Sequence, residues 1–111
     1  MILIINETEN ERISLQKSFF DLGMNAHSCN FKSSHELLAR YRFDAILLTD
    51  ASKYERADLL CKNLKASFPK IPLIMLAQNE ETDLLDKIIK HADNIILSGT
   101  PLKKVVEIIF E

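Results

Sequence analysis

Residues 43–50 read Phe43-Asp44-Ala45-Ile46-Leu47-Leu48-Thr49-Asp50, an apolar run that ends in two polar residues. The run does not alternate between apolar and polar positions. A strand of this kind is typical of a parallel sheet with helices on both faces. Similar runs predict four further strands, at residues 2–5, 24–29, 73–76 and 95–97, of which 24–29 is the weakest.

Segments with helical periodicity lie between these strands and predict helices over residues 9–22, from 33 onward, over 57–67, over 82–91 and from Pro101 onward. Ser33 and Glu36 form the pattern of a capping box, and Thr100 is the predicted N-cap of the last helix. Gly23 is the predicted left-handed stop of the first helix. Side chains expected on the apolar face of that helix are Ile13, Leu15, Phe19, Phe20 and Leu22, and those expected to point inward from 57–67 are Leu60, Cys61 and Leu64.

Strands that alternate with helices predict an α/β fold, a doubly wound five-stranded parallel sheet of the flavodoxin-like type, in one domain over residues 1–111. In such folds, ligand sites lie outside the carboxyl ends of the strands. The residues there are Asn6, Glu7, Thr49, Asp50, Ala77, Gln78, Ser98 and Gly99.

Composition excludes several classes of protein. The 14 basic and 16 acidic residues give a formal charge of −2, which disfavours a domain that binds nucleic acid by electrostatics alone. Cys29 and Cys61 have neither zinc-site spacing nor the pattern of a disulfide framework, so we expect reduced thiols. No apolar run is long enough to cross a membrane, and we expect a cytoplasmic protein.

The chain resembles the receiver domain of bacterial response regulators (the CheY-like domain) over essentially its whole length. The segments that carry the resemblance are Ile2–Glu7, Phe43–Leu48, Ile71–Ala77 and His91–Ser98. The resemblance implies a role in two-component phosphorelay signalling. Receivers of this family transfer a phosphoryl group to an aspartate after the third strand, and two carboxylates after the first strand help to hold Mg²⁺.

The sequence departs from this family pattern at almost every functional position. Asn6 and Glu7 stand where the family has its acidic pair. Ala77 replaces the Ser or Thr after the fourth strand, Ser98 replaces the lysine after the fifth, and Ile95 replaces the switch aromatic. Losing one preorganised charge-stabilising group of this kind typically costs about 3 kcal/mol of transition-state stabilisation. Conventional phosphorylation is therefore disfavoured, and we expect no catalytic residue, no resident metal and no cofactor.

The phosphoacceptor position has two candidates. Counting from Asp44 places Thr49 there, whereas the Leu48-Thr49-Asp50 ending matches a common family pattern that makes Asp50 the acceptor. Threonine cannot form an aspartyl phosphate, but Asp50 with Glu7 and Mg²⁺ would make an atypical receiver that is still phosphorylated.

We interpret the chain as a degenerate receiver, or pseudo-receiver, of a signalling or transcription regulator, and not as an enzyme. By resemblance, it would bind a protein partner or a second copy through its fourth helix, fifth strand and fifth helix, at Leu84–Ala92, Asp93–Leu97 and Lys103–Ile109. Candidate contact residues are Leu84, Ile88, Ile95, Lys103, Lys104 and Val106. DNA binding is expected only from a downstream domain absent from this chain, since Met1 leads directly into the first strand and suggests an N-terminal receiver.

Two alternative functions remain, and they belong to different classes of protein. The first is the atypical receiver phosphorylated at Asp50 with Mg²⁺. The second is a flavodoxin-like domain that binds or converts a small molecule, which is disfavoured because the chain has no glycine-rich phosphate loop and its segment Asn6–Asn10 is acidic.

Overall fold

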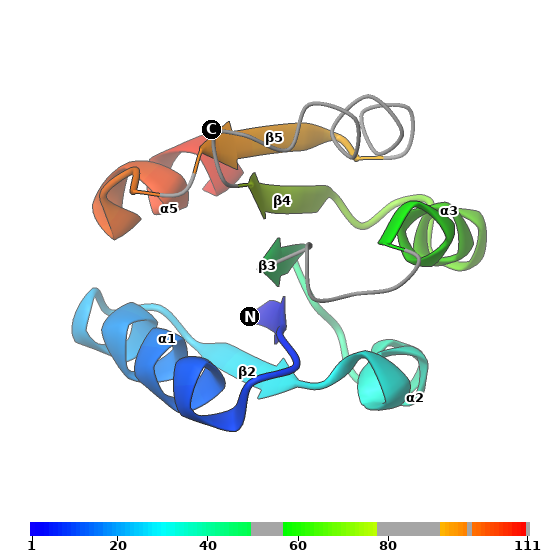
Figure 1. Ribbon diagram of the computed structural model, residues 1–111, viewed down its shortest axis with the longest axis horizontal. Helices are drawn as coiled ribbons and strands as arrows, with labels where there is room; N and C mark the ends of the chain where they lie inside the picture. The colour runs from blue at the N-terminus through cyan, green and yellow to red at the C-terminus, as the bar shows by residue number, and fades with distance from the viewer. Residues whose placement is uncertain (50–56, 78–91, 98, 111) are drawn as a thin grey trace.

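The computed structural model describes residues 1–49, 57–77, 92–97 and 99–110. Five parallel strands form one sheet in the order β2-β1-β3-β4-β5 (Figure 1). This arrangement confirms the predicted doubly wound parallel sheet. The strands are β1 (Ile2–Ile5), β2 (Ala26–Cys29), β3 (Ala45–Thr49), β4 (Leu73–Ala77) and β5 (Asn94–Leu97).

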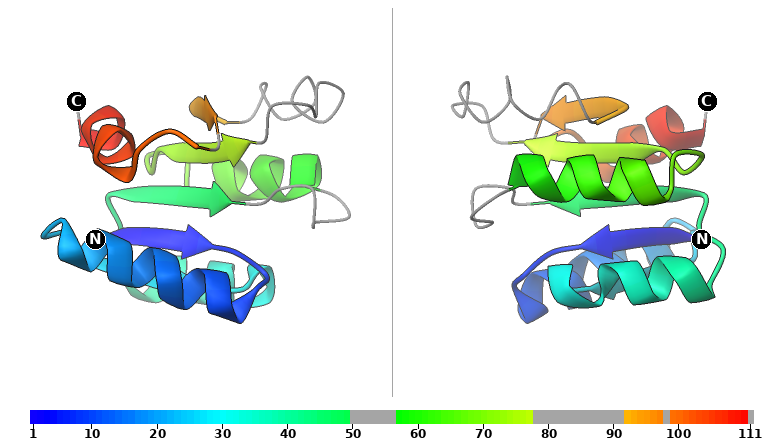
Figure 2. Two further views of the ribbon diagram at one scale, coloured as in Figure 1. Left: turned by 60° about the vertical axis from the view of Figure 1, so that its left-hand side comes forward. Right: turned by 90° about the vertical axis from the view of Figure 1, so that its right-hand side faces the viewer.

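Helices cover both faces of the sheet, as the unbroken apolar strands predict. Helices α1 (Glu9–Asp21) and α5 (Leu102–Phe110) lie on one face, and α2 (Ser34–Arg40) and α3 (Ala57–Ser67) lie on the other (Figures 1 and 2). A short 3₁₀ helix, η1 (Phe31–Ser33), precedes α2. The helix predicted over residues 82–91 lies outside the described residues.

The core is divided into two layers because successive strand residues point to opposite faces. Leu3 and Ile5 belong to the cluster under α2 and α3, together with Leu60, Cys61 and Leu64, which point inward as predicted. The other cluster lies under α1 and α5 and includes Ile2, Ile4, Phe19 and Val105.

Gly23 ends α1 as predicted. Its φ of 78° lies in the left-handed region, which glycine adopts without the steric cost of a Cβ. The N–H of Gly23 donates to the Phe20 carbonyl, and the N–H of Met24 donates to the Phe19 carbonyl, both over 2.9 Å. These two bonds form a Schellman motif, which turns the chain from α1 toward β2.

The predicted apolar face of α1 is partly wrong. Phe19 is buried and Leu15 packs against the same cluster, but Ile13, Phe20 and Leu22 are exposed. Since β2 is the edge strand and α1 lies along that side of the sheet, only a narrow stripe of the helix reaches the core.

Both predicted side-chain caps are also wrong. Ser33 makes no side-chain cap hydrogen bond, and instead Asn30 accepts from the Ser33 N–H over 3.1 Å at the start of η1. At the other end of the chain, the Thr100 hydroxyl donates to the Leu97 carbonyl over 2.7 Å. The first helical carbonyl of α5 is that of Pro101, which accepts from the Val105 N–H over 3.1 Å.

An ion pair ties α3 to the last two strands. Lys65 Nζ lies 2.8 Å from Asp93 Oδ2 and donates to the Pro69 and Ile71 carbonyls, each over 3.2 Å. The same carboxylate oxygen accepts from the Leu73 N–H over 2.6 Å. The end of α3 and the starts of β4 and β5 are thereby joined at the amino end of the sheet. Within the four described ranges, none of the helices has both the length and the apolar character of a membrane span.

Candidate functional site

The carboxyl ends of β1 and β3 bring Asn6 and Thr49 together, as parallel neighbouring strands require. Both side chains are polar and nearly inaccessible, with 1% of Asn6 and 5% of Thr49 exposed. Asn6 Nδ2 donates to Thr49 Oγ1 over 2.7 Å, and the Thr49 hydroxyl donates to the Ile5 carbonyl over 3.3 Å. The Thr49 hydroxyl is therefore used as both donor and acceptor.

Asn6 is the centre of a wider network. Its Nδ2 also donates to Glu11 Oε2 over 2.9 Å, and its Oδ1 accepts from the Thr8 N–H over 2.7 Å. The Asn6 carbonyl accepts from Arg12 Nη1 over 2.7 Å. Every polar atom of this side chain has a partner, which a buried amide requires. The arrangement needs an amide, because a carboxylate could not donate to Thr49 or Glu11.

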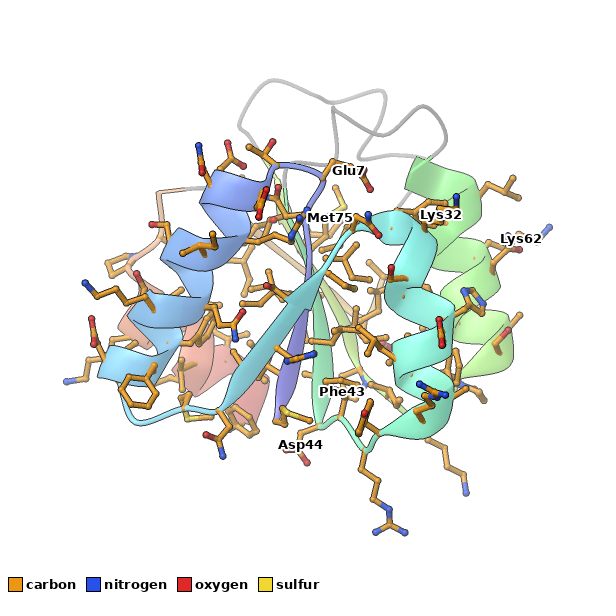
Figure 3. The ribbon with its side chains drawn as sticks, turned by 90° about the horizontal axis from the view of Figure 1, so that it is seen from below. Glu7, Lys32, Phe43, Asp44, Lys62 and Met75 are labelled. Atoms are coloured by element: carbon orange, nitrogen blue, oxygen red, sulfur yellow. The ribbon has the colours of Figure 1, made fainter. Side chains whose placement is uncertain are left out.

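Glu7 is hydrogen-bonded to the backbone of η1. Its Oε1 accepts from the Phe31 N–H over 2.7 Å, at the first residue of η1. Figure 3 shows Glu7 leaning toward the segment that carries Lys32, at the end of the molecule opposite Phe43 and Asp44. Glu7, which occupies one position of the family's acidic pair, thus binds the connection between β2 and α2.

Among the described residues at this edge, the groups that suit a hard cation are the Glu7 and Glu11 carboxylates and the Asn6 amide oxygen. Each of them already accepts a hydrogen bond within the protein. In the described parts of the chain, no three His, Cys, Asp or Glu side chains are grouped closely enough to hold a metal ion.

Four predicted site positions have limited description. Asp50, Gln78 and Ser98 lie outside the described residues, and Thr49 is the last residue of β3. Ala77 is the last residue of β4, where its backbone pairs with Leu97 of β5. Ile95, at the switch position, is half-buried and packs against the cluster under α2 and α3.

The predicted contact surface is seen only in part, because Leu84 and Ile88 also lie outside the described residues. Lys103 and Lys104 are exposed on α5, Val106 is half-buried, and Lys104 Nζ lies 3.8 Å from Glu107 Oε2. Leu97, which lies in the predicted region Asp93–Leu97 but was not singled out as a contact residue, is 52% exposed on the edge strand β5. Its position at the end of a short apolar run offers no sequence signal that separates it from buried neighbours.

The other residues missed by the sequence analysis are Glu11 and Arg12, which lie in the first turns of α1. An acid five positions after Asn6 is a weak signal, because its contact depends on how α1 turns back over β1. Arg12 also acts on the neighbouring thiol. Burial raises the pKa of Cys29 to about 11, Arg12 opposes this shift and Glu7 adds to it. Cys29 is therefore protonated at neutral pH and is a poor nucleophile.

Comparison with known proteins identifies the family and the fold of the chain. Residues 1–98 match the family described as "Flagellar regulatory protein FleQ". The search of curated proteins finds no match. Among solved structures, a response regulator receiver protein from Pseudomonas putida is 13% identical, with a TM-score of 0.83 over 98% of this chain and 93% of that one. A response regulator from Thermotoga maritima is 19% identical, with a TM-score of 0.80 over 99% of this chain and 97% of that one.

NtrX from Brucella abortus is a longer protein, and part of its structure is similar to this chain. It is 14% identical to this chain, with a TM-score of 0.79 over 96% of this chain. The chain spans only 25% of the length of NtrX. Identities this low show a common fold, and the receiver fold predicted from the sequence is confirmed.

Proposed function

Because the chain belongs to the family of the flagellar regulatory protein FleQ and is a response regulator receiver domain, we propose that it regulates by protein–protein contact without conventional aspartyl phosphorylation. In this proposal Thr49 occupies the acceptor position. The observation that carries the proposal is the 2.7 Å hydrogen bond from Asn6 Nδ2 to Thr49 Oγ1. The process regulated is flagellar, as the family description implies.

The chemistry of the acceptor supports this proposal. Phosphorylation of a receiver needs a carboxylate that attacks phosphorus and becomes an acyl phosphate. The Thr49 hydroxyl is neutral, 5% exposed and engaged with Asn6 and the Ile5 carbonyl. A phosphoryl group could reach its oxygen only after both hydrogen bonds break.

The hydrogen bonds of the carboxylates at this edge also support a domain without a bound metal. Mg²⁺ binds through carboxylate oxygens and demands near-ideal octahedral geometry. Glu7 is bound to the Phe31 N–H, and Glu11 is bound to the Asn6 amide. Moving Glu7 toward a metal would break the bond that holds the start of η1, and moving Glu11 would break a bond to the buried Asn6 amide. We therefore propose that the domain has no resident metal, no cofactor and no catalytic activity of its own.

The neutral hydrogen bond between Asn6 and Thr49 has a consequence for regulation. In a phosphorylated receiver, the added charge shifts a conformational equilibrium, whereas here that equilibrium is set by bonds already made within the fold. We propose that the domain stays in one conformation and presents a constant surface to its partner. The surface consists of β5 and α5, including Leu97, Lys103, Lys104 and Val106; the candidates Leu84 and Ile88 lie outside the described residues. Its occupant is a second copy or another regulatory protein in the cytoplasm, and any DNA contact belongs to a separate effector domain.

The test is the intact mass of the protein after incubation with acetyl phosphate and Mg²⁺, with the Asp50→Asn variant in parallel. We expect no phosphate-sized gain in either protein. A gain that disappears in Asp50→Asn would refute the proposal and establish the atypical receiver that uses Asp50 and Mg²⁺. A gain that persists in Asp50→Asn would place the modification elsewhere and would equally refute it.

A further inference from the structure

The outer side of α1 and the turn into β2 form a groove of about 440 Å³ at the edge of the sheet. Ile13, Gln16, Lys17 and Phe20 line it from α1, and residues 24–26 line it from the turn. We call this feature the α1 groove. It lies at the amino end of β2, whereas Asn6 and Thr49 lie at the carboxyl ends of β1 and β3, so the groove is separate from the candidate site.

The apolar residues of the α1 groove are unusually exposed for their size. Phe20 is 72% exposed and Ile13 is 60% exposed. The two are seven positions apart, which places them on one face of the helix about 10.5 Å from each other along its axis. A partner helix that packs along α1 would meet these two side chains with its own apolar residues at the same seven-residue spacing. Large exposed apolar side chains grouped in this way are typical of a binding surface.

Lys17 supplies the charge of the groove. It is the one charged residue among those that line the groove, and it lies between Ile13 and Phe20 along α1. The ion pairs among the described residues all involve cations other than Lys17. No described carboxylate therefore pairs with the Lys17 ammonium group. A ligand that complements the groove therefore presents two apolar side chains with an acidic side chain between them.

A second copy of the chain fits this charge pattern poorly. In a two-fold symmetric antiparallel pairing of α1 with itself, Ile13 of each copy would meet Phe20 of the other. Lys17 lies close to the midpoint of that stripe, so its ammonium group would come near Lys17 of the second copy. Like charges brought together in this way oppose association.

We propose that the α1 groove binds an acidic amphipathic helix of a partner protein. The helix places two apolar residues, two turns apart, against Ile13 and Phe20, and a carboxylate between them against Lys17. This inference goes beyond the proposed function, because it concerns the opposite edge of the sheet from β5 and α5 and does not depend on phosphorylation.

The experiment uses a fluorescein-labelled synthetic peptide of about 20 residues, long enough to form a helix. The peptide carries leucines seven positions apart with glutamates between them, and a matched peptide carries lysines in place of those glutamates. Fluorescence anisotropy measures the binding of each peptide to the protein. We expect saturable binding of the acidic peptide and weaker binding of the basic one.

Variants of the protein locate the contact. Phe20→Ser should weaken binding of the acidic peptide about tenfold, as expected for a central aromatic anchor. Lys17→Glu should weaken it about two- to fivefold, the range for an exposed ion pair, and should reverse the preference in favour of the basic peptide. Leu22→Ser is the matched control, because Leu22 is exposed on the same end of α1 but does not line the groove. It should leave binding unchanged.

Three results would overturn the proposal. These are no saturable binding of the acidic peptide, no change of preference in Lys17→Glu, or an equal loss in Leu22→Ser and Phe20→Ser. A fourth result that would overturn the proposal can come from sedimentation. If the wild-type chain forms a dimer that Phe20→Ser dissociates, a second copy covers the groove instead of a partner helix. Circular dichroism and thermal unfolding of each variant confirm that the fold is intact before binding is compared.

Discussion

Asn6 and Thr49, which are 43 positions apart in the chain, are joined by a 2.7 Å hydrogen bond between their side chains. The amide donates and the hydroxyl accepts, so this bond carries no net charge. It lies where the receiver family has charged groups that respond to phosphate and metal. A neutral bond at this place ties β1 to β3 at all times and needs no ligand to form.

Asn6→Asp should destabilise the fold by about 3 kcal/mol at neutral pH. The variant loses the donations to Thr49 and Glu11 and buries a carboxylate next to the Glu11 carboxylate. Urea unfolding measures the loss. Close carboxylates raise the pKa of at least one of the pair, so the loss should shrink as the pH falls and one of them is protonated. Adding Glu11→Gln should recover part of the stability, and a stable Asn6→Asp single variant would contradict the need for an amide.

Millimolar Mg²⁺ should leave the melting temperature unchanged. A ligand that binds only the native state stabilises it, by about 2.7 kcal/mol when present at a hundred times its Kd. Differential scanning calorimetry with Mg²⁺, and with EDTA as the control, detects such a shift. A rise in Tm that Glu7→Gln abolishes would show that Glu7 leaves Phe31 to bind the ion.

Lys65→Met should lower the free energy of unfolding by about 1–2 kcal/mol, because it removes three donations from one ammonium group. Lys104→Met is the matched control. Lys104 is more exposed and lies 3.8 Å from Glu107, and an exposed pair of this kind contributes about 0–1 kcal/mol. Urea unfolding of both variants compares them. Equal losses would mean that the contacts of Lys65 add nothing beyond a surface ion pair.

Stability should fall between pH 9 and pH 11 as the Cys29 thiol ionises. The pKa of this thiol is raised in the folded state, so the folded protein holds the proton more tightly than the unfolded chain. This contribution is fully present below pH 9 and is lost as the pH rises toward 11, with a total of about 3 kcal/mol. Urea unfolding across this range measures it. Cys29→Ala should flatten the profile, whereas the same slope in that variant would assign the effect to another group.

Leu97→Glu should weaken self-association if a second copy occupies the β5 and α5 surface. Leu97 is half-exposed on the edge strand, whereas Ile95 packs against the core, so a charge at Leu97 tests the surface with less damage to the fold. Sedimentation velocity measures the distribution of monomer and dimer. A wild-type dimer that Leu97→Glu leaves intact would exclude this surface as the dimer interface.

The order of elements was predictable because it depends on local patterns. Ile2–Ile5 and Ala45–Leu48 are unbroken apolar runs, which only a sheet covered on both faces can bury. Gly23 marked the end of α1 because a left-handed residue favours glycine. The caps at Ser33 and Thr100 were not predictable. A 3₁₀ helix capped by the Asn30 side chain precedes α2, and the Thr100 hydroxyl donates to the Leu97 carbonyl instead of capping α5.

The sequence by itself therefore determined the parallel sheet, its covered faces and the loss of the family's charged residues. Tertiary structure alone decided what Asn6, Glu7 and Phe20 do. Asn6 meets Thr49, and Glu7 meets the Phe31 N–H, only because parallel strands bring distant strand ends to one edge. Phe20 is exposed because α1 lies beside an edge strand. These are contacts between elements, and a periodicity within one element carries no information about them.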